Sequence, residues 1–189
     1  MHPDTGEASL LVEPLLGGWG AGHAKDGERG QFCQGNGETY NIPIEVTETR
    51  YGVRVDQYAF HTDDGGAGEF RGGNGVMLDY RITSDEAFLT GIFGRHTFRC
   101  WGIGAGHKGS PNYIKVLRKD GAEEIHGYTA RLRLEKGDVV RLTTGTGGGY
   151  GDPRKRPRDK VRADLRNGYI TAEQASAHYG YDAAKEAAE

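Results

Sequence analysis

The sharpest change in composition along the chain lies at Gly145-Thr146-Gly147-Gly148-Gly149-Tyr150-Gly151-Asp152-Pro153. Upstream of this stretch, apolar and polar residues alternate as they do in short strands. Downstream, the sequence becomes basic and then helical in period. Glycine adopts backbone conformations with positive φ that other residues avoid, and Pro153 restricts its own φ and the conformation of the residue before it. The stretch therefore either holds a ligand or turns the chain between a sheet and a helical tail.

The residues between 42 and 143 predict a half-buried sheet. Apolar residues recur at every second position in runs separated by glycine-rich turns, and this alternation is typical of antiparallel strands with one face in water. The short apolar run from Leu10 to Leu16 can form one further buried strand. The expected strand positions are Ile44, Val46, Val53, Val55, Val76, Leu78, Tyr80, Ile82, Phe88 to Phe93, Ile114 to Leu117, Tyr128 to Leu134 and Val139 to Thr143.

The residues after 153 change to a helical period. Val161 and Leu165 lie four residues apart, and Asn167-Gly168 is a helix stop. The segment Thr171–Gln174 fits a capping box, and the helix that it begins is expected to end at Gly180. We therefore expect an α+β fold. Residues 1–151 would form a glycine-rich, mainly antiparallel β domain, and residues 152–189 a short α-helical C-terminal tail packed on it.

Size and composition exclude several protein classes. A chain of 189 residues can bury a real core, and its net charge of -3 gives no bulk attraction to nucleic acid or acidic lipid. The 32 glycines follow no three-residue period, which excludes collagen. Cys33 and Cys100 are too few for a disulfide scaffold. We see neither a leader peptide nor an apolar run long enough to span a membrane, so a cytoplasmic location is expected.

The glycine stretch follows a strand and precedes a helix, which is the arrangement of a phosphate-binding loop. It lacks the Gly-Lys-Ser/Thr ending of a P-loop, and a dinucleotide fingerprint needs a parallel βαβ unit where this sequence indicates antiparallel strands. Asp152 would also place a negative charge beside a bound phosphate. We favour a tight corner packed on backbone.

Basic residues follow the glycine stretch, and they could bind nucleic acid or another anion. Aromatic residues do not alternate with them, and Asp159 and Asp164 dilute their charge. A solvated helix face or an interface with ion pairs is the favoured interpretation. The alternative function for the whole chain is a stand-alone module that binds anions or nucleic acid through the basic segment 154–166.

Two loops hold candidate chemical groups. His23 and Asp26 share one loop and are the candidate catalytic residues, whereas His61 and Asp64 share another and are candidate ligand-binding residues. Neither pair has the spacing of a known metal motif, so no metal site is expected on this chain. His96, His107 and His126 are isolated in the sequence. Cys100, beside Arg99, is expected to be a small buried residue.

Three glycine motifs in a fixed order resemble the C-terminal part of the hydantoinase B / 5-oxoprolinase family, the B-type subunits that are also related to acetone and acetophenone carboxylase subunits. The resemblance runs from about Leu15 to Tyr181, and Trp19 departs from it because the family often has glycine there. The matching motifs are Gly17–Gly27, Asp64–Gly73 and Gly147–Pro153, followed in the tail by Gly168–Thr171 and Ala175–Gly180.

The resemblance implies that the chain works beside an ATP-binding A-type subunit. Such complexes use ATP to open cyclic amides such as hydantoins or 5-oxoproline, or to carboxylate ketones such as acetone. B-type subunits are much longer than this chain, and their metal-binding His and Asp residues belong to an N-terminal part with no counterpart here. ATP and a divalent metal are therefore expected in partner chains, with no cofactor bound by this one.

Arg71 follows a glycine-rich turn, and it is the third candidate ligand-binding residue. Its guanidinium group can clamp a carboxylate or phosphate through two hydrogen bonds, or it can hold the turn by pairing with Asp64, which we favour. The expected role is that of a structural and assembly part of a B-type subunit, inactive alone. Its partners would be the A-type subunit and the N-terminal part of the B-type subunit, in a hetero-oligomer without nucleic acid or membrane.

Overall fold

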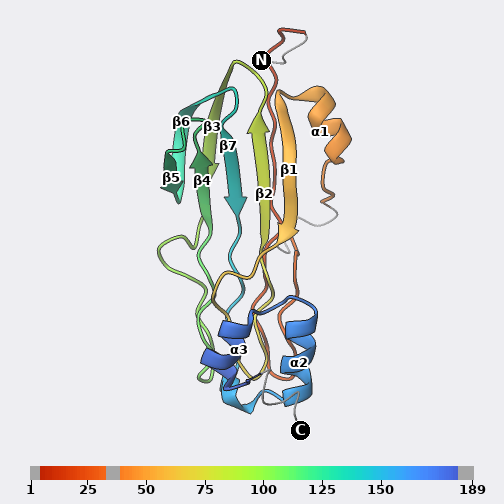
Figure 1. Ribbon diagram of the computed structural model, residues 1–189, viewed down its shortest axis with the longest axis vertical. Coiled ribbons are helices and arrows are strands. Elements are labelled where there is room, and N and C mark those ends of the chain that lie inside the picture. The colour runs from red at the N-terminus through yellow and green to blue at the C-terminus, as the bar shows by residue number, and fades with distance from the viewer. Residues whose placement is uncertain (1–4, 33–38, 183–189) are drawn as a thin grey trace.

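The computed structural model describes residues 5–32 and 39–182, so Cys33 lies outside the described residues. Strands dominate one end of the elongated molecule, and two helices cover the other (Figure 1). The chain forms α1 (Ile44–Arg50), β1 (Val53–Phe60), β2 (Val76–Ile82), β3 (Glu86–Ile92), β4 (Tyr113–Leu117), β5 (Glu123–His126), β6 (Tyr128–Glu135), β7 (Val139–Thr143), the 3₁₀-helix η2 (Pro153–Lys155), α2 (Arg158–Arg166) and α3 (Ala172–Tyr179).

The strands form two antiparallel sheets, which confirms the predicted α+β fold. The larger sheet has the order β1-β2-β7-β4-β5, and β3 pairs with β6 in a second sheet. The register pairs Tyr80 with Val140 and Val116 with Val140, so apolar side chains of β2, β7 and β4 lie in one row. This row forms the face on which the core assembles.

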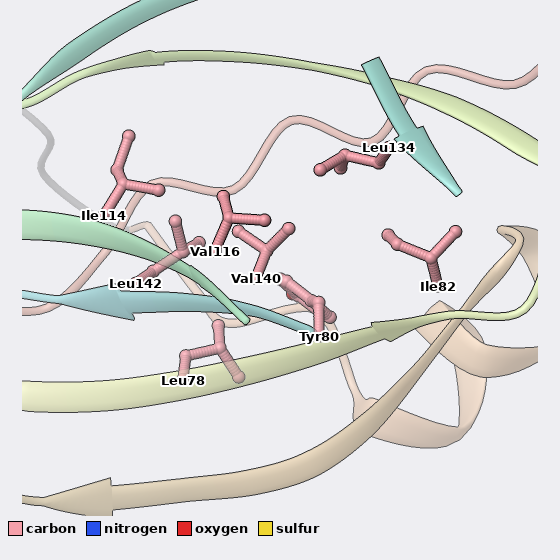
Figure 2. Packing of buried hydrophobic residues seen from close by; sticks show 8 residues of the cluster. All are labelled: Leu78, Tyr80, Ile82, Ile114, Val116, Leu134, Val140 and Leu142. Atoms are coloured by element: carbon pink, nitrogen blue, oxygen red, sulfur yellow. The ribbon is translucent and has the colours of Figure 1, made fainter. Parts of the chain in front are cut away.

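The core lies between the larger sheet and the small sheet formed by β3 and β6. In Figure 2, Leu134 of β6 points toward the cluster that Ile114, Val116 and Val140 form on the larger sheet. Ile114 and Val116 are completely buried. Burying an aliphatic side chain of this size contributes about 1.5–3 kcal/mol relative to leaving it in water. The two-residue alternation in the sequence thus identified the residues that hold the sheets together.

Two predicted strands are wrong. Ile44 and Val46 lie in α1, where Pro43 begins the helix with φ -53° and Glu45 places a negative charge in its first turn. The run from Leu10 to Leu16 forms no strand, because only one isolated bridge, at Gly17, pairs this part of the described chain. Short apolar runs form strands only where a partner strand completes the hydrogen bonds.

The helical tail forms a second cluster at the other end of the molecule. Val161, Tyr179 and Tyr181 pack with Ala67 of a glycine loop. Thr171 caps α3 with the predicted capping box, and Gly180 ends that helix with φ 61°. No helix in the described ranges combines the length and the apolar character that crossing a bilayer requires.

Candidate functional site

The loop after β7 lies among three other glycine-rich segments. Three successive residues, Gly147, Gly148 and Gly149, face three different neighbours. A Cβ atom on them would overlap the carbonyl oxygens of Trp19, Trp101 and Ala67, respectively. Only glycine lets backbones approach this closely on three sides of one segment. We call the four segments, residues 17–27, 64–73, 102–109 and 145–151, the glycine platform.

Hydrogen bonds within the platform use the donors that a phosphate would need. The N–H groups of Gly147, Gly149 and Gly151 donate to the carbonyl oxygens of Gly73 (3.0 Å), His107 (2.9 Å) and Ile103 (2.9 Å). A phosphate-binding loop must instead leave its N–H groups pointing at the ligand. The loop is therefore a structural corner, which is the interpretation that the sequence favoured over a phosphate-binding loop.

Asp26 lies in a buried ion-pair network. Its carboxylate accepts two hydrogen bonds from Arg156, at 2.7 and 2.9 Å. Arg156 also donates to Asp164 at 2.9 Å and to the carbonyl oxygen of Glu69 at 2.9 Å. Burial raises the pKa of Asp26, but hydrogen bonds and attraction from Arg156 outweigh it and hold that pKa below its usual range. Asp26 thus joins the platform to the tail.

Arg71 pairs with Asp164 and not with the predicted partner Asp64. Its Nε atom donates to Asp164 at 3.1 Å, and its Nη1 atom donates to the carbonyl oxygen of Gly72 at 3.2 Å. The guanidinium group also stacks on the ring of Tyr169, 4.7 Å from the centroid. Sequence proximity suggested Asp64, whereas folding of the tail brings a carboxylate from 93 positions away. The guanidinium group is engaged inside the protein.

His61 is buried where β1 ends. Its Nε2 atom lies 2.5 Å from the carbonyl oxygen of Thr144, and its Nδ1 atom faces the backbone N–H and the carboxylate of Asp63. Burial lowers the pKa of His61, but Asp63 and the Thr144 carbonyl raise it by more, so the net pKa lies above the ordinary histidine value. This candidate ligand-binding residue links the ends of β1 and β7.

His23 lies at an exposed hairpin tip. Hydrogen bonds between the backbones of Gly22 and Lys25 close the hairpin, and the His23 ring meets the Tyr150 ring edge-on at 5.9 Å. Asp26, the residue grouped with His23 in the sequence, pairs with Arg156 instead. The two candidate catalytic side chains therefore have separate contacts.

Asp64 lies in a small open cavity of about 330 Å³ beside the platform. His178 of α3 contacts the Asp64 carboxylate at 2.6 Å, and the ring of His107 meets the His178 ring edge-on at 5.0 Å. Gly65, Arg99 and Lys108 complete the lining. His107 is thus not isolated, and His178 was missed because only the position of α3 brings it here. The cavity can contact an anion or transfer a proton.

The basic segment makes contacts both within the tail and between the tail and the rest of the protein. Arg156 is 4% exposed within the network described above. Arg158 donates to the carbonyl oxygen of Gly180 at 3.0 Å, and the Lys160 ammonium lies 5.5 Å from the centre of the Phe70 ring. These contacts match the favoured interpretation of an interface with ion pairs. The sequence did not predict the ion pair between Arg156 and Asp164, because the two residues are eight positions apart within a charged segment and no motif connects them.

Metal-ligating side chains do not converge in the part of the chain that the structure describes. In residues 5–32 and 39–182, no group of three or more His, Cys, Asp or Glu side chains is placed to hold a metal ion. The candidate site is therefore a packed platform with one cavity that carries titratable groups.

The comparisons with known proteins agree with this architecture. The hydantoinase B/oxoprolinase family matches residues 1–153. Caprolactamase subunit beta of Pseudomonas jessenii is 33% identical over 91% of this chain. The crystal structure of ATP-dependent caprolactamase from that organism has a TM-score of 0.74 at 31% identity and covers 88% of the chain.

An acetone carboxylase structure shares the fold, with a TM-score of 0.72 at 21% identity over 87% of this chain and 26% of its own. The chain spans 30% of the length of the caprolactamase subunit and 30% of the caprolactamase crystal chain. The family match covers all four segments of the glycine platform. The chain belongs to the hydantoinase B/oxoprolinase family.

Proposed function

We propose that this chain is the structural and assembly part of a B-type subunit in a cytoplasmic, ATP-dependent enzyme that opens cyclic amides. One relative, matched over 91% of this chain, is a caprolactamase subunit, and caprolactam is a cyclic amide. The observation that carries the structural role is the engagement of the candidate residues. Asp26 and Arg71 are used in contacts that hold the platform and the tail together, and His61 is used in a contact that links the ends of β1 and β7.

The remaining functions of the enzyme then belong to other parts of the complex. An A-type subunit would bind ATP, and the rest of the B-type subunit would hold a divalent metal. A ketone carboxylase is the other activity compatible with the family, and its support here is a likeness of fold. The chain would contribute a rigid surface beside the reaction centre, with the Asp64 cavity as its exposed polar feature.

Reconstitution tests this function. The chain is co-expressed with its cognate A-type subunit and the remainder of the B-type subunit, and ATP-dependent ring opening of caprolactam, hydantoin and 5-oxoproline is measured. We expect turnover of at least one substrate by the complex, and none by the chain alone or by the complex without it. Turnover by the isolated chain, or a complex equally active without it, would contradict the proposal.

A further inference from the structure

The small sheet presents apolar side chains to solvent. Ile92 of β3 pairs in register with Tyr128 of β6, and the two side chains are 76% and 66% exposed. Phe88, which precedes Ile92 on β3, is 54% exposed. The guanidinium group of Arg131 lies 5.4 Å from the centre of the Phe88 ring. A two-stranded sheet is only marginally stable by itself. We call Phe88, Ile92 and Tyr128 the outer face of the small sheet.

An apolar groove lies between the small sheet and the larger one. Its volume is about 640 Å³, and its lining includes core side chains of both sheets, with Ile114 and Leu134 among them. Leu10, which also lines the groove, is 80% exposed. A groove lined by core residues is typical of a domain whose remaining packing partner is another segment or chain.

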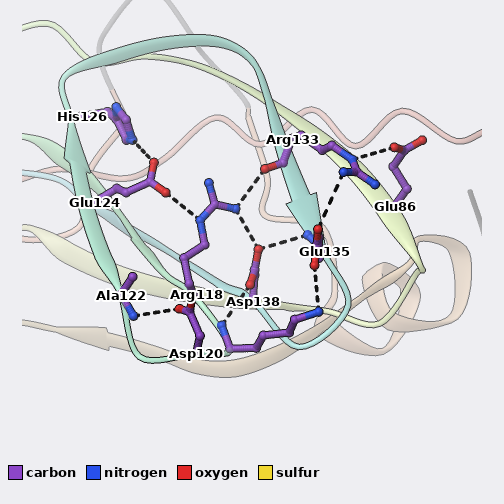
Figure 3. A network of polar contacts seen from close by, with 10 residues as sticks. Glu86, Arg118, Asp120, Ala122, Glu124, His126, Arg133, Glu135 and Asp138 are labelled. Carbon is purple, nitrogen blue, oxygen red and sulfur yellow. Dashed lines mark hydrogen bonds and ion pairs between the residues drawn. The ribbon is translucent and has the colours of Figure 1, made fainter.

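A polar network connects the two sheets at one end (Figure 3). Arg118, which follows the last residue of β4, donates to the carbonyl oxygen of Arg133 in β6 at 2.9 Å and to the Asp138 carboxylate at 2.8 Å. The same carboxylate accepts a hydrogen bond from the backbone N–H of Glu135 at 3.0 Å. These bonds tie β6 to β4 and to the start of β7. The small sheet is thus fixed in place before any partner binds.

We propose that the outer face of the small sheet and the groove beneath it form the docking surface for the remainder of the B-type subunit. This inference rests on the function proposed above. The caprolactamase subunit contains a region that matches this chain and accounts for 30% of its length, so most of such a subunit lies outside that region and is available to cover this surface. A preformed groove beside exposed Ile92 and Tyr128 offers the apolar burial that stable packing of two parts needs.

The chemistry of the surface specifies the segment that fits it. Apolar side chains would fill the groove, and acidic side chains would face Arg131 and Arg133, which lie on the same strand as Tyr128. Arg133 already pairs with Glu86 at 2.9 Å, so the rim carries charge of both signs. The docked segment is therefore apolar at its centre and polar at its edge.

Binding in trans tests this surface. The remainder of the cognate B-type subunit is purified, and its Kd for the full chain is measured for wild type, Ile92→Glu and the matched control Ile125→Glu. Ile125 is 60% exposed, and its register partner Lys115 lies between core residues Ile114 and Val116, so Ile125 faces away from the groove. We expect Ile92→Glu to weaken binding by about tenfold or more and the control to change it by less than about twofold.

The outcomes separate the two proposals. If wild type binds and Ile92→Glu binds equally well, the docking surface is wrong while the proposed function stands. If wild type does not bind the remainder at all, both proposals fail. Hydrogen exchange of wild type gives a second measurement that needs no variant, with backbone protection expected to rise in residues 86–92 and 128–135 on binding. Unchanged exchange in those strands within a formed complex would also overturn the surface.

Discussion

His61 shows how a buried titratable side chain couples the fold to pH. It lies between the ends of β1 and β7, where its ring contacts the Thr144 carbonyl and Asp63. Its pKa is raised in the folded protein, so its stabilising effect is complete below the unfolded pKa and is lost as pH rises through the folded pKa. The pKa of Asp63 is lowered, first by its hydrogen bond with His61, so its contribution is lost when pH falls through the folded pKa of that carboxyl.

We expect His61→Gln to remove part of the pH dependence of stability. The free energy of unfolding is measured by urea titration at about pH 5.5 and about pH 8.5, which bracket the ordinary histidine pKa of ~6.5. Wild type should lose more stability than His61→Gln when the pH rises from about 5.5 to about 8.5, because only wild type carries the His61 proton that is lost in this range. The exposed residue His23 provides the control, and His23→Gln should follow wild type. Parallel losses in wild type and His61→Gln would refute the assignment.

The glycine loop after β7 is the element that organises one half of the protein. Its three central glycines each face a different backbone segment, and the N–H groups of Gly147, Gly149 and Gly151 bond to neighbouring carbonyl oxygens. Close approach on three sides leaves no direction in which a methyl group can fit. The loop therefore depends on glycine for space, which is a different requirement from the positive φ of Gly151 at 74°.

The contrast between two glycines tests this packing. Gly148→Ala should destabilise the protein by at least about 1–3 kcal/mol, because a backbone carbonyl oxygen, not a movable side chain, would meet the new methyl group. Gly94→Ala is the control, since a Cβ atom at Gly94 has no heavy atom within 4 Å. Urea denaturation of both variants provides the measurement. Equal midpoints for Gly148→Ala and wild type would show that the loop relaxes easily.

At the scale of the whole molecule, the tail is fastened to the glycine platform by charge as well as by packing. Arg156 connects Asp26 of the platform with Asp164 of α2, and its side chain is 1% exposed. Val161 and Tyr179 pack in the apolar cluster that also contains Ala67 of the platform. The two helices lie at the end opposite the strands, as Figure 1 shows, so these contacts decide whether that end holds together.

Removing the central guanidinium group should therefore have a global effect. Arg156→Met leaves Asp26 without its guanidinium partner and Asp164 with Arg71 alone, and losing one member of a buried pair costs about 3–5 kcal/mol. Asp26 is partly exposed and will recover some hydration, which favours the lower end of that range. Lys155→Met changes an exposed neighbour and should leave the unfolding midpoint nearly unchanged. Thermal unfolding that is the same for Arg156→Met and wild type would contradict a structural role for the network.

The sequence predicted local features wherever neighbouring residues provide the whole signal. The alternation from Val76 to Ile82 identified β2, and Thr171 with Gln174 identified the start of α3. It misplaced Ile44 and Val46, because a short run of β-branched residues forms a strand only with a partner, and Pro43 favours a helix there. The edge strand β5 was also missed, since its four residues are too few to show a period.

The sequence by itself determined the sheet-forming alternation, the helix caps and the motifs that identify the family, because each depends on residues close together in the chain. Only the tertiary structure decided how the charged residues are used. Arg71 meets Asp164 and His178 meets Asp64 across 93 and 114 positions, after the tail has folded onto the platform. The physical reason is that ion pairing depends on distance in space, and the placement of α2 and α3 by apolar packing sets that distance.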